Sequence, residues 1–294
     1  MNARYTAFQA LQKLKRNDGY SNIVLDAVLK NSGLSDTDRG FAAALFYGVL
    51  ERGITLDAVI RRYLRSSIKL SQPVRLILQL GLYQLLYMDK IPDNAAVDES
   101  VKLVRKIGQL KAAGLVNAIL RQFIRDQKQI PLPRSGCQRL SVEYACPEWM
   151  IESFTKDYGY DNCVGILQGF LQHRYLAVRA NTNQISAADL LMLFTKQGIQ
   201  VRRSTICPDA LILESAGDVR QLPGYAQGLF HVQDLAAQLC VQALNIAGTM
   251  RVLDVCAAPG GKSFTIAQQL QSGGEVLALD LYPQKVELIL QGAK

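Results

Sequence analysis

Apolar residues recur every three or four positions through the first 130 residues, which is the spacing of one face of an α-helix. Ser35 precedes Asp36 and Asp38 as a capped helix start would, and Pro92 separates two apolar stripes because proline cannot continue a helix. No strand pattern interrupts this region. The pattern predicts a bundle of six or seven helices, with apolar stripes at Tyr5–Leu14, Ile23–Leu29, Phe41–Val49, Val74–Met88, Ala95–Ile107 and Ala112–Ile124.

The pattern changes beyond residue 130. The segment Gln127–Gly136 is rich in proline and polar residues and is predicted to be a linker. A helix is expected over Glu148–Tyr158, after Pro147 and before Gly159, and a second over Ala187–Lys196, capped by Ser186. Tyr175–Ala180 and Leu211–Glu214 are typical of strands. Together these elements predict a small α+β domain.

A third pattern begins at residue 251. An apolar strand, Arg251–Cys256, leads into a turn of small residues, Ala257–Gly261, and then into an amphipathic helix, Lys262–Leu270. A second strand, Glu275–Leu279, ends at Asp280. Strand, glycine turn and helix form the first unit of a doubly wound sheet, where the helix N-terminus can bind an anion. We therefore predict three domains: 1–130, 131–222 and 223–294.

Three ligands can be considered for this turn. A nucleoside triphosphate loop of the form G-x-x-x-x-G-K-S is excluded, because Cys256 occupies its leading glycine position. A dinucleotide is poorly supported, since G-x-G-x-x-G is absent. S-adenosylmethionine fits better: its carboxylate suits a helix N-terminus, and its ribose hydroxyls suit an acid at the end of the next strand, here Asp280. A surface aspartate at a strand end remains the alternative for that residue.

Charge is unevenly distributed along the chain. The net charge is +8, yet residues 1–134 hold 21 Lys and Arg against 11 Asp and Glu, while the remainder is slightly acidic. A basic excess confined to one region is the usual mark of a nucleic-acid partner, although a solubilising surface is an equally good interpretation. The candidate contacts are Arg61, Arg62, Arg65, Lys102, Arg105, Lys106 and Lys111.

Several functional classes find no support in the composition. The six cysteines show no C-x-x-C spacing and only two histidines accompany them, so we expect no metal site and cysteines that are buried as small apolar residues. The apolar run Leu76–Met88 is too short to span a bilayer, and no signal peptide is evident. We therefore expect a cytoplasmic monomer without a membrane contact.

The motifs in this chain resemble those of the bacterial rRNA cytosine-5 methyltransferases of the RsmB (Sun, Fmu) type. Cys256-Ala257-Ala258-Pro259-Gly260-Gly261-Lys262 is similar to the cofactor loop of that family, Gly228–Asp234 to its lead-in strand, and Gly114–Arg121 to the end of its NusB-like domain. The resemblance implies a multidomain fold: an all-α NusB-like bundle, a small α+β connecting domain and the start of a Rossmann-like α/β methyltransferase domain. It also implies S-adenosyl-L-methionine, bound by those seven loop residues and Asp280, and 16S rRNA as the partner.

The implied reaction transfers a methyl group to C5 of a cytosine in small-subunit rRNA. A cysteine thiolate adds to C6 of the base, so that C5 gains the nucleophilicity it otherwise lacks. The family places its two cysteines in Pro-Cys and Thr-Cys motifs, and neither dipeptide occurs here. We therefore assign no catalytic residue, expect a fragment with a half-covered sheet that is inactive alone, and keep a non-catalytic RNA-binding protein as the alternative.

Overall fold

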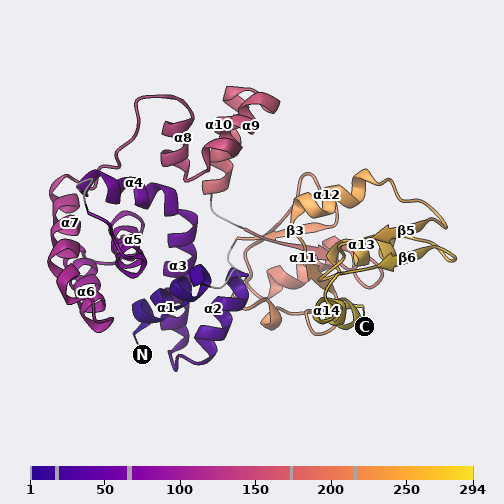
Figure 1. Ribbon diagram of the computed structural model, residues 1–294. Coiled ribbons are helices and arrows are strands. Elements are labelled where there is room, and N and C mark those ends of the chain that lie inside the picture. The colour runs from indigo at the N-terminus through magenta and orange to yellow at the C-terminus, as the bar shows by residue number, and fades with distance from the viewer. Residues whose placement is uncertain (1, 17–19, 65–67, 173–174, 215–216, 294) are drawn as a thin grey trace. The chain divides into compact units, whose positions relative to one another are not determined.

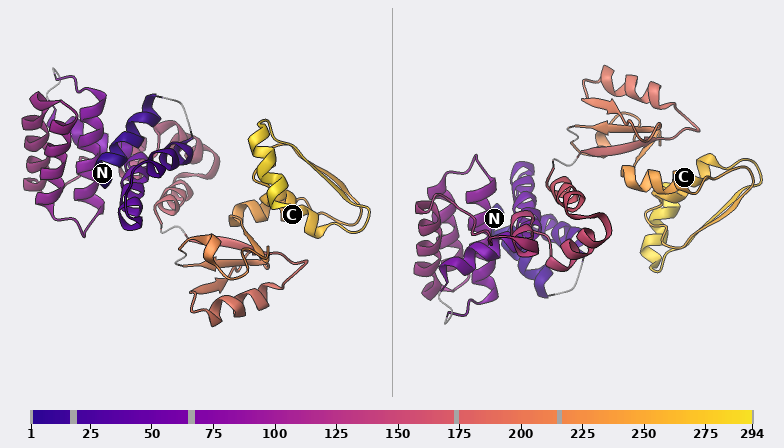
Figure 2. Two further views of the ribbon diagram at one scale, coloured as in Figure 1. Left: turned by 90° about the horizontal axis from the view of Figure 1, so that it is seen from below. Right: turned by 90° about the horizontal axis from the view of Figure 1, so that it is seen from above.

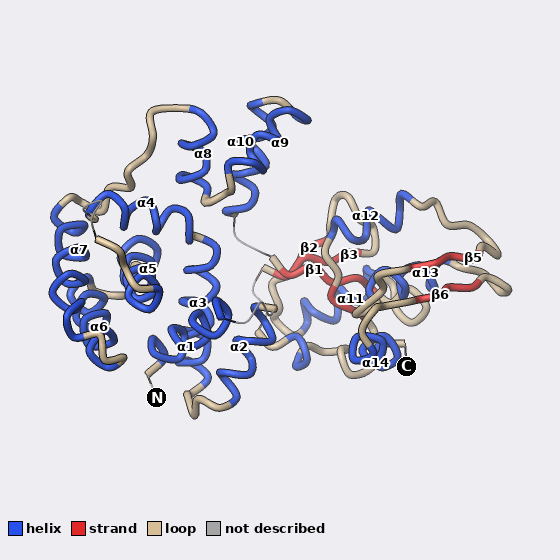
Figure 3. The backbone as a smooth tube through the Cα atoms, in the orientation of Figure 1, coloured by secondary structure: helices blue, strands red, loops and turns tan. Residues whose placement is uncertain are grey.

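The computed structural model describes residues 2–16, 20–64, 68–172, 175–214 and 217–293, and Arg65 lies outside them. The chain divides into two compact units, residues 1–172 and 173–294. Within the described residues, the first unit contains helices and no strand, and every strand belongs to the second unit (Figure 3).

The first unit confirms the predicted helical bundle. Seven α-helices and one short 3-10 helix precede residue 126 in the described part of the chain, and three further helices complete the unit (Figure 1). Their bounds are α1 Ala3–Arg16, α2 Ser21–Lys30, α3 Asp36–Glu51, α4 Gly53–Tyr63, α5 Gln72–Tyr87, α6 Asp93–Lys106, η1 Leu110–Ala112, α7 Ala113–Arg125, α8 Gly136–Tyr144, α9 Glu148–Tyr158 and α10 Tyr160–Leu171.

Helix α5 lies at the centre of the bundle and packs against α1, α3, α4, α6 and α7. The two glutamines that interrupt its apolar run are buried but hydrogen-bonded: Gln84 accepts from Arg4 Nε at 2.7 Å, and Gln79 donates to Asp57 at 2.9 Å. The run is therefore a core helix, as predicted. Across the described residues, the helices are all too short or too polar to cross a bilayer.

Helices α8 to α10 belong to the first unit, although we placed them in the second predicted domain. They share a small core that includes Leu140, Ile151 and Leu167. The hydroxyl of Thr55, on α4, donates to the carbonyl of Val142, on α8, at 2.6 Å. The division into compact units thus falls at a different residue from either boundary predicted from the sequence pattern, and the two predicted domain boundaries stay predictions.

The second unit contains two sheets. Strands β2, β3, β1 and β4 form an antiparallel sheet in that order, and β5 and β6 form a parallel pair. The bounds are β1 Leu176–Ala180, α11 Ala187–Lys196, β2 Val201–Arg203, β3 Ala210–Leu213, η2 Val219–Gln221, β4 Phe230–Val232, α12 Leu235–Ala243, β5 Arg251–Asp254, α13 Gly261–Gln269, β6 Glu275–Ala278 and α14 Pro283–Gly292.

Strand β1 is the inner strand that joins β3 to β4. Val178 pairs with Leu211 on one side and with Val232 on the other. Helix α11 lies along one face of the sheet (Figure 2). Its Phe194 packs edge-on against Phe230. Strand β4 belongs to the third predicted domain, yet it completes the sheet of the second, so the sheet extends past the predicted boundary at residue 222.

The parallel pair confirms the predicted half-covered sheet. Side chains alternate along β5 and β6, and those on one face contact α13 while those on the other are exposed to solvent. The exposed apolar side chains at these strands are Leu253, Val255, Leu277 and Leu279.

The expectation of buried cysteines is right for some of them and wrong for others. Cys146, Cys163 and Cys207 are buried, and burial raises the pKa of the Cys146 and Cys207 thiols. Cys240 and Cys256 are exposed, because α12 presents Gln238 and Val241 to the interior and the turn after β5 leaves Cys256 at the surface.

Candidate cofactor site

The glycine turn begins where β5 ends and leads directly into α13. Gly260 is the N-cap of that helix and has φ = +115°, in the left-handed region that favours glycine. A Cβ on Gly260 would overlap the ring of Phe264, and a Cβ on Gly292 would come within 2.7 Å of the same ring. The Phe264 ring, on α13, therefore packs between Gly260 of the turn and Gly292 of α14.

Asp254 connects the end of β5 to the start of α13. One of its carboxylate oxygens accepts from the Ser263 hydroxyl at 2.8 Å, and the other accepts from the backbone N–H of Cys256 at 3.3 Å. We did not include Asp254 or Ser263 among the predicted site residues. The position of Asp254 at the carboxyl end of a parallel strand was the signal that pointed to it.

Asp280 and the turn lie together, although 22 residues separate Asp280 from Ala258. The backbone N–H of Ala258 donates to Asp280 Oδ2 at 3.1 Å, and the N–H of Ala257 donates to the carbonyl of Leu279 at 2.9 Å. The Asp280 side chain is 9% exposed, and Lys285 Nζ lies 3.9 Å from its other oxygen. The parallel pairing of β5 with β6 brings these groups to one edge of the sheet.

The N-terminus of α13 offers free donors beside this carboxylate. No hydrogen-bond acceptor among the described residues contacts the backbone N–H groups of Gly261, Lys262 and Ser263, and no side chain caps the helix. The helix dipole adds partial positive charge at the same end. Of the other predicted residues, Ala257 is buried, Ala258 and Lys262 are half-buried, and Cys256 and Pro259 are exposed.

A cluster of buried, hydrogen-bonded polar side chains also positions α13. Thr265 Oγ1 donates to Gln233 Oε1 at 2.9 Å, and His231 Nε2 lies 3.3 Å from the same oxygen. Burial lowers the pKa of His231, and the charge of Arg179 adds to that effect. A hollow of about 850 Å³ lies here, with Pro259 among its lining residues. Sequence reasoning gave these side chains no role.

The predicted basic residues of the first unit are partly engaged in other contacts. Lys102 pairs with Glu99 at 2.8 Å, and Lys106 Nζ lies 3.9 Å from the centre of the Tyr5 ring. Arg61 and Arg62 are exposed at the end of α4. Groups of three or more acidic, histidine or cysteine side chains that could hold a metal do not occur in the described parts of the chain.

A parallel strand pair, a glycine turn, a free helix N-terminus and a carboxylate at the next strand end define an α/β domain of the nucleotide-cofactor class. Comparison with family models shows which protein families this domain and the preceding parts of the chain match. Residues 1–125 match the NusB family, 146–220 the RsmF/B-like ferredoxin-like domain, and 241–294 the 16S rRNA methyltransferase RsmB/F model.

Curated relatives match along nearly the whole chain. The probable ribosomal RNA small subunit methyltransferase B of Bacillus subtilis strain 168 is 34% identical over 291 residues, covering 99% of this chain and 65% of the relative. The ribosomal RNA small subunit methyltransferase B of Escherichia coli O1:K1 / APEC is 30% identical, covering 100% of this chain and 67% of the relative. The chain therefore belongs to the ribosomal RNA small subunit methyltransferase B family and spans about two thirds of the length of these relatives.

A solved structure shares the fold. The crystal structure of PH0851 superposes with a TM-score of 0.73 at 17% identity, covering the whole of this chain and 67% of that one. The predicted fold class, a helical NusB-like part followed by a small antiparallel sheet and a partial methyltransferase fold, is confirmed by this match and by the family models.

Proposed function

We propose that this chain provides the RNA-binding and cofactor-binding parts of an enzyme that methylates C5 of a cytosine in 16S rRNA. The methyl group comes from S-adenosylmethionine. The observation that carries the proposal is the juxtaposition of the free α13 N-terminus with Asp280, in a chain that belongs to a family of rRNA methyltransferases. An rRNA substrate also implies a cytoplasmic location.

The turn suits the amino-acid end of the cofactor. Backbone N–H groups at a helix start bind a carboxylate well, because they lie at the positive end of the helix dipole. They donate hydrogen bonds without a charged side chain that would have to lose its hydration. Gly260 and Gly261 carry no side chain, so a ligand can approach the backbone closely. Asp254, through Ser263 and Cys256, holds the turn in the conformation that presents these donors.

Asp280 suits the ribose end. One oxygen of its carboxylate is oriented by the Ala258 N–H, and a carboxylate so held can accept hydrogen bonds from the vicinal hydroxyls of a ribose. The side chain lies at the same sheet edge as the free donors of α13, so one extended ligand can contact both. When bound, S-adenosylmethionine supplies an electrophilic methyl group, and the chain's residues bind and orient it.

We assign no nucleophile among the six cysteines. Cys146 and Cys207 precede prolines instead of following them and are buried, and Cys256 is part of the proposed cofactor loop. The chemistry at C5 needs a thiolate that reaches C6 of the target base. We therefore expect no methyl transfer by this chain alone. A tritium-transfer assay on 16S rRNA checks this, and incorporation above background would contradict it.

Isothermal titration calorimetry with S-adenosylmethionine tests the cofactor part of the proposal. We expect saturable binding, and Asp280→Asn should weaken it about tenfold or more, since a hydrogen bond to a charged group contributes ~1.5–3 kcal/mol. Asn keeps an oxygen for the Ala258 N–H, so the turn should stay folded.

Asp218→Asn is the matched control, because Asp218 forms an exposed ion pair with Arg220 on η2, apart from the site. Equal affinities for all three proteins would refute the role of Asp280. If the wild-type chain binds 16S rRNA but no cofactor, the alternative of a non-catalytic RNA-binding protein would replace the proposal.

A further inference from the structure

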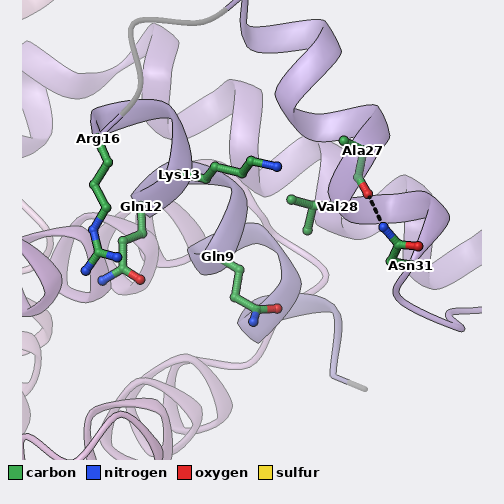
Figure 4. A pocket seen from close by; sticks show the side chains of 7 residues that line it. All are labelled: Gln9, Gln12, Lys13, Arg16, Ala27, Val28 and Asn31. Carbon is green, nitrogen blue, oxygen red and sulfur yellow. Dashed lines mark hydrogen bonds between the residues drawn. The ribbon is translucent and has the colours of Figure 1, made fainter.

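A groove runs between the first two helices of the chain. One face of α1 carries Gln9, Gln12, Lys13 and Arg16, because Gln12 and Lys13 each lie three or four residues from both Gln9 and Arg16. The groove has a volume of about 500 Å³, and Lys13 extends across it toward α2 (Figure 4).

Helix α2 supplies the opposite wall. Ala27 and Val28 give it an apolar floor, and Asn31 stands at its end. The Asn31 amide nitrogen donates to the carbonyl of Ala27 at 3.0 Å, which holds this side chain at the end of α2 (Figure 4). The lining contains two cations, three amides and no carboxylate.

The cations of this groove have no internal partner. In the described part of the chain, neither Lys13 nor Arg16 forms an ion pair, a hydrogen bond or a contact with an aromatic ring, and both are exposed. Lys102 and Lys106, on α6, are by contrast held by Glu99 and Tyr5. The groove therefore combines a concave surface with two cations that are available to a ligand, whereas Lys102 and Lys106 already have partners within the protein.

We propose that the groove between α1 and α2 binds the sugar–phosphate backbone of an RNA strand. Lys13 and Arg16 contact phosphates, and the amides of Gln9, Gln12 and Asn31 hydrogen-bond to ribose 2′-hydroxyls. This inference rests on the proposed rRNA substrate and assigns the place where the first unit holds it. Amides at the ribose edge give the groove a preference for RNA over DNA, because only RNA carries the 2′-hydroxyl.

Equilibrium filter binding of the whole chain to 16S rRNA transcripts tests the groove, in the absence of cofactor and over a series of salt concentrations. Each phosphate contact on a single strand contributes about 0.7 to the slope of log affinity against log salt. Lys13→Gln/Arg16→Gln should therefore reduce that slope by about 1.4. Over the tenfold range from 1 M to 0.1 M salt, this is about a 25-fold loss of affinity at 0.1 M.

Lys15→Gln/Lys30→Gln is the matched control. It removes the same total charge, one cation from α1 and one from α2, at exposed positions that do not line the groove. The proposal expects it to retain most of the affinity, and an equal loss in both double variants would overturn it. An unchanged affinity in Lys13→Gln/Arg16→Gln would overturn it too.

Three further measurements address the identity and the position of the ligand. Gln12→Leu should reduce the preference for RNA over DNA of the same sequence, and inorganic polyphosphate should compete poorly. Acetylation footprinting should show Lys13 protected by RNA and Lys15 still reactive, and the reverse pattern would contradict the proposal. Calorimetry with S-adenosylmethionine is independent of this groove, so failure here leaves the proposed cofactor site intact.

Discussion

At the scale of single residues, Gly260 combines a left-handed backbone with a close aromatic neighbour, so it tolerates a side chain poorly. We expect Gly260→Ala to destabilise the second unit by more than the ~1–2 kcal/mol of a left-handed alanine, because its methyl group would also overlap the Phe264 ring. Chemical denaturation monitored by fluorescence or circular dichroism measures the loss.

Gly273 separates the two causes. It also has a positive φ, +95°, but a Cβ there would meet only the Thr249 methyl at an ordinary 3.5 Å. Gly273→Ala should therefore cost the backbone strain alone. Equal losses in the two variants would show that the Phe264 ring yields to the new methyl group.

A second prediction concerns the pH dependence of the free energy of unfolding, and it rests on His231. Its folded-state pKa is lowered by burial, while the unfolded chain takes up a proton near pH 6.5. The unfolded state therefore binds more protons, and the free energy of unfolding falls as the pH drops below about 6.5. Denaturation midpoints of the second unit at pH 7.5 and 5.5 measure this.

Histidine occurs twice in the chain, which makes the control simple. His231→Gln should flatten the pH dependence over this range, and His173→Gln should preserve it. A wild-type slope that persists in His231→Gln would assign the effect to other groups.

The glycine turn could be located from sequence because its residues are contiguous and its glycines act locally. The partnership of Asp280 with the turn was also foreseeable, since parallel strands end at a common edge. The bridging role of Asp254 and the position of Phe264 between Gly260 and Gly292 could not be foreseen. Both depend on contacts between residues that become neighbours only after α13 and α14 have packed.

At the scale of elements, two helices begin with the same reciprocal cap. The Ser35 hydroxyl accepts from the Asp38 N–H and donates to its carboxylate, and Ser186 does the same with Asp189. Loss of such a cap costs about 1 kcal/mol. We expect Ser35→Ala to destabilise the first unit and Ser186→Ala the second.

Differential scanning calorimetry can separate the two effects. Each variant is the control for the other, because each cap lies in a different compact unit. If either substitution shifted both unfolding transitions equally, the units would unfold as one, and independent stability would be contradicted.

Strong local signals made some elements easy to predict. Helix α9 spans Glu148–Tyr158 and α11 spans Ala187–Lys196, as expected from a proline, a serine cap and two glycines. Strands β2 and β4 were harder, since three residues are too few to show an alternation. Their strand conformation depends on partners that lie elsewhere in the chain, β3 and β1.

At the scale of the whole molecule, the first unit should fold without the second. It has its own large apolar core, with Phe8, Phe46 and Phe123 fully buried. We expect the fragment 1–172 to show a helical circular dichroism spectrum and a cooperative thermal transition. A gradual melt without a transition would show that its packing depends on residues 173–294.

The fragment also tests where RNA is held. The basic excess lies in residues 1–134, and the proposed groove uses only α1 and α2. The sequence could predict this asymmetry of charge, because it requires only counting. It could not predict the groove, because the groove depends on which faces of the two helices point toward each other.

The pairing of β4 with β1 sets an order of events during synthesis. Residues up to 213 complete β1, β2 and β3, but one edge of β1 stays unpaired until Phe230–Val232 has been made. At ~5–20 residues per second, the 19 residues between Leu213 and Val232 take about one to four seconds. For that interval the nascent chain carries an open apolar strand edge, available to chaperones and to neighbouring nascent chains on a polysome.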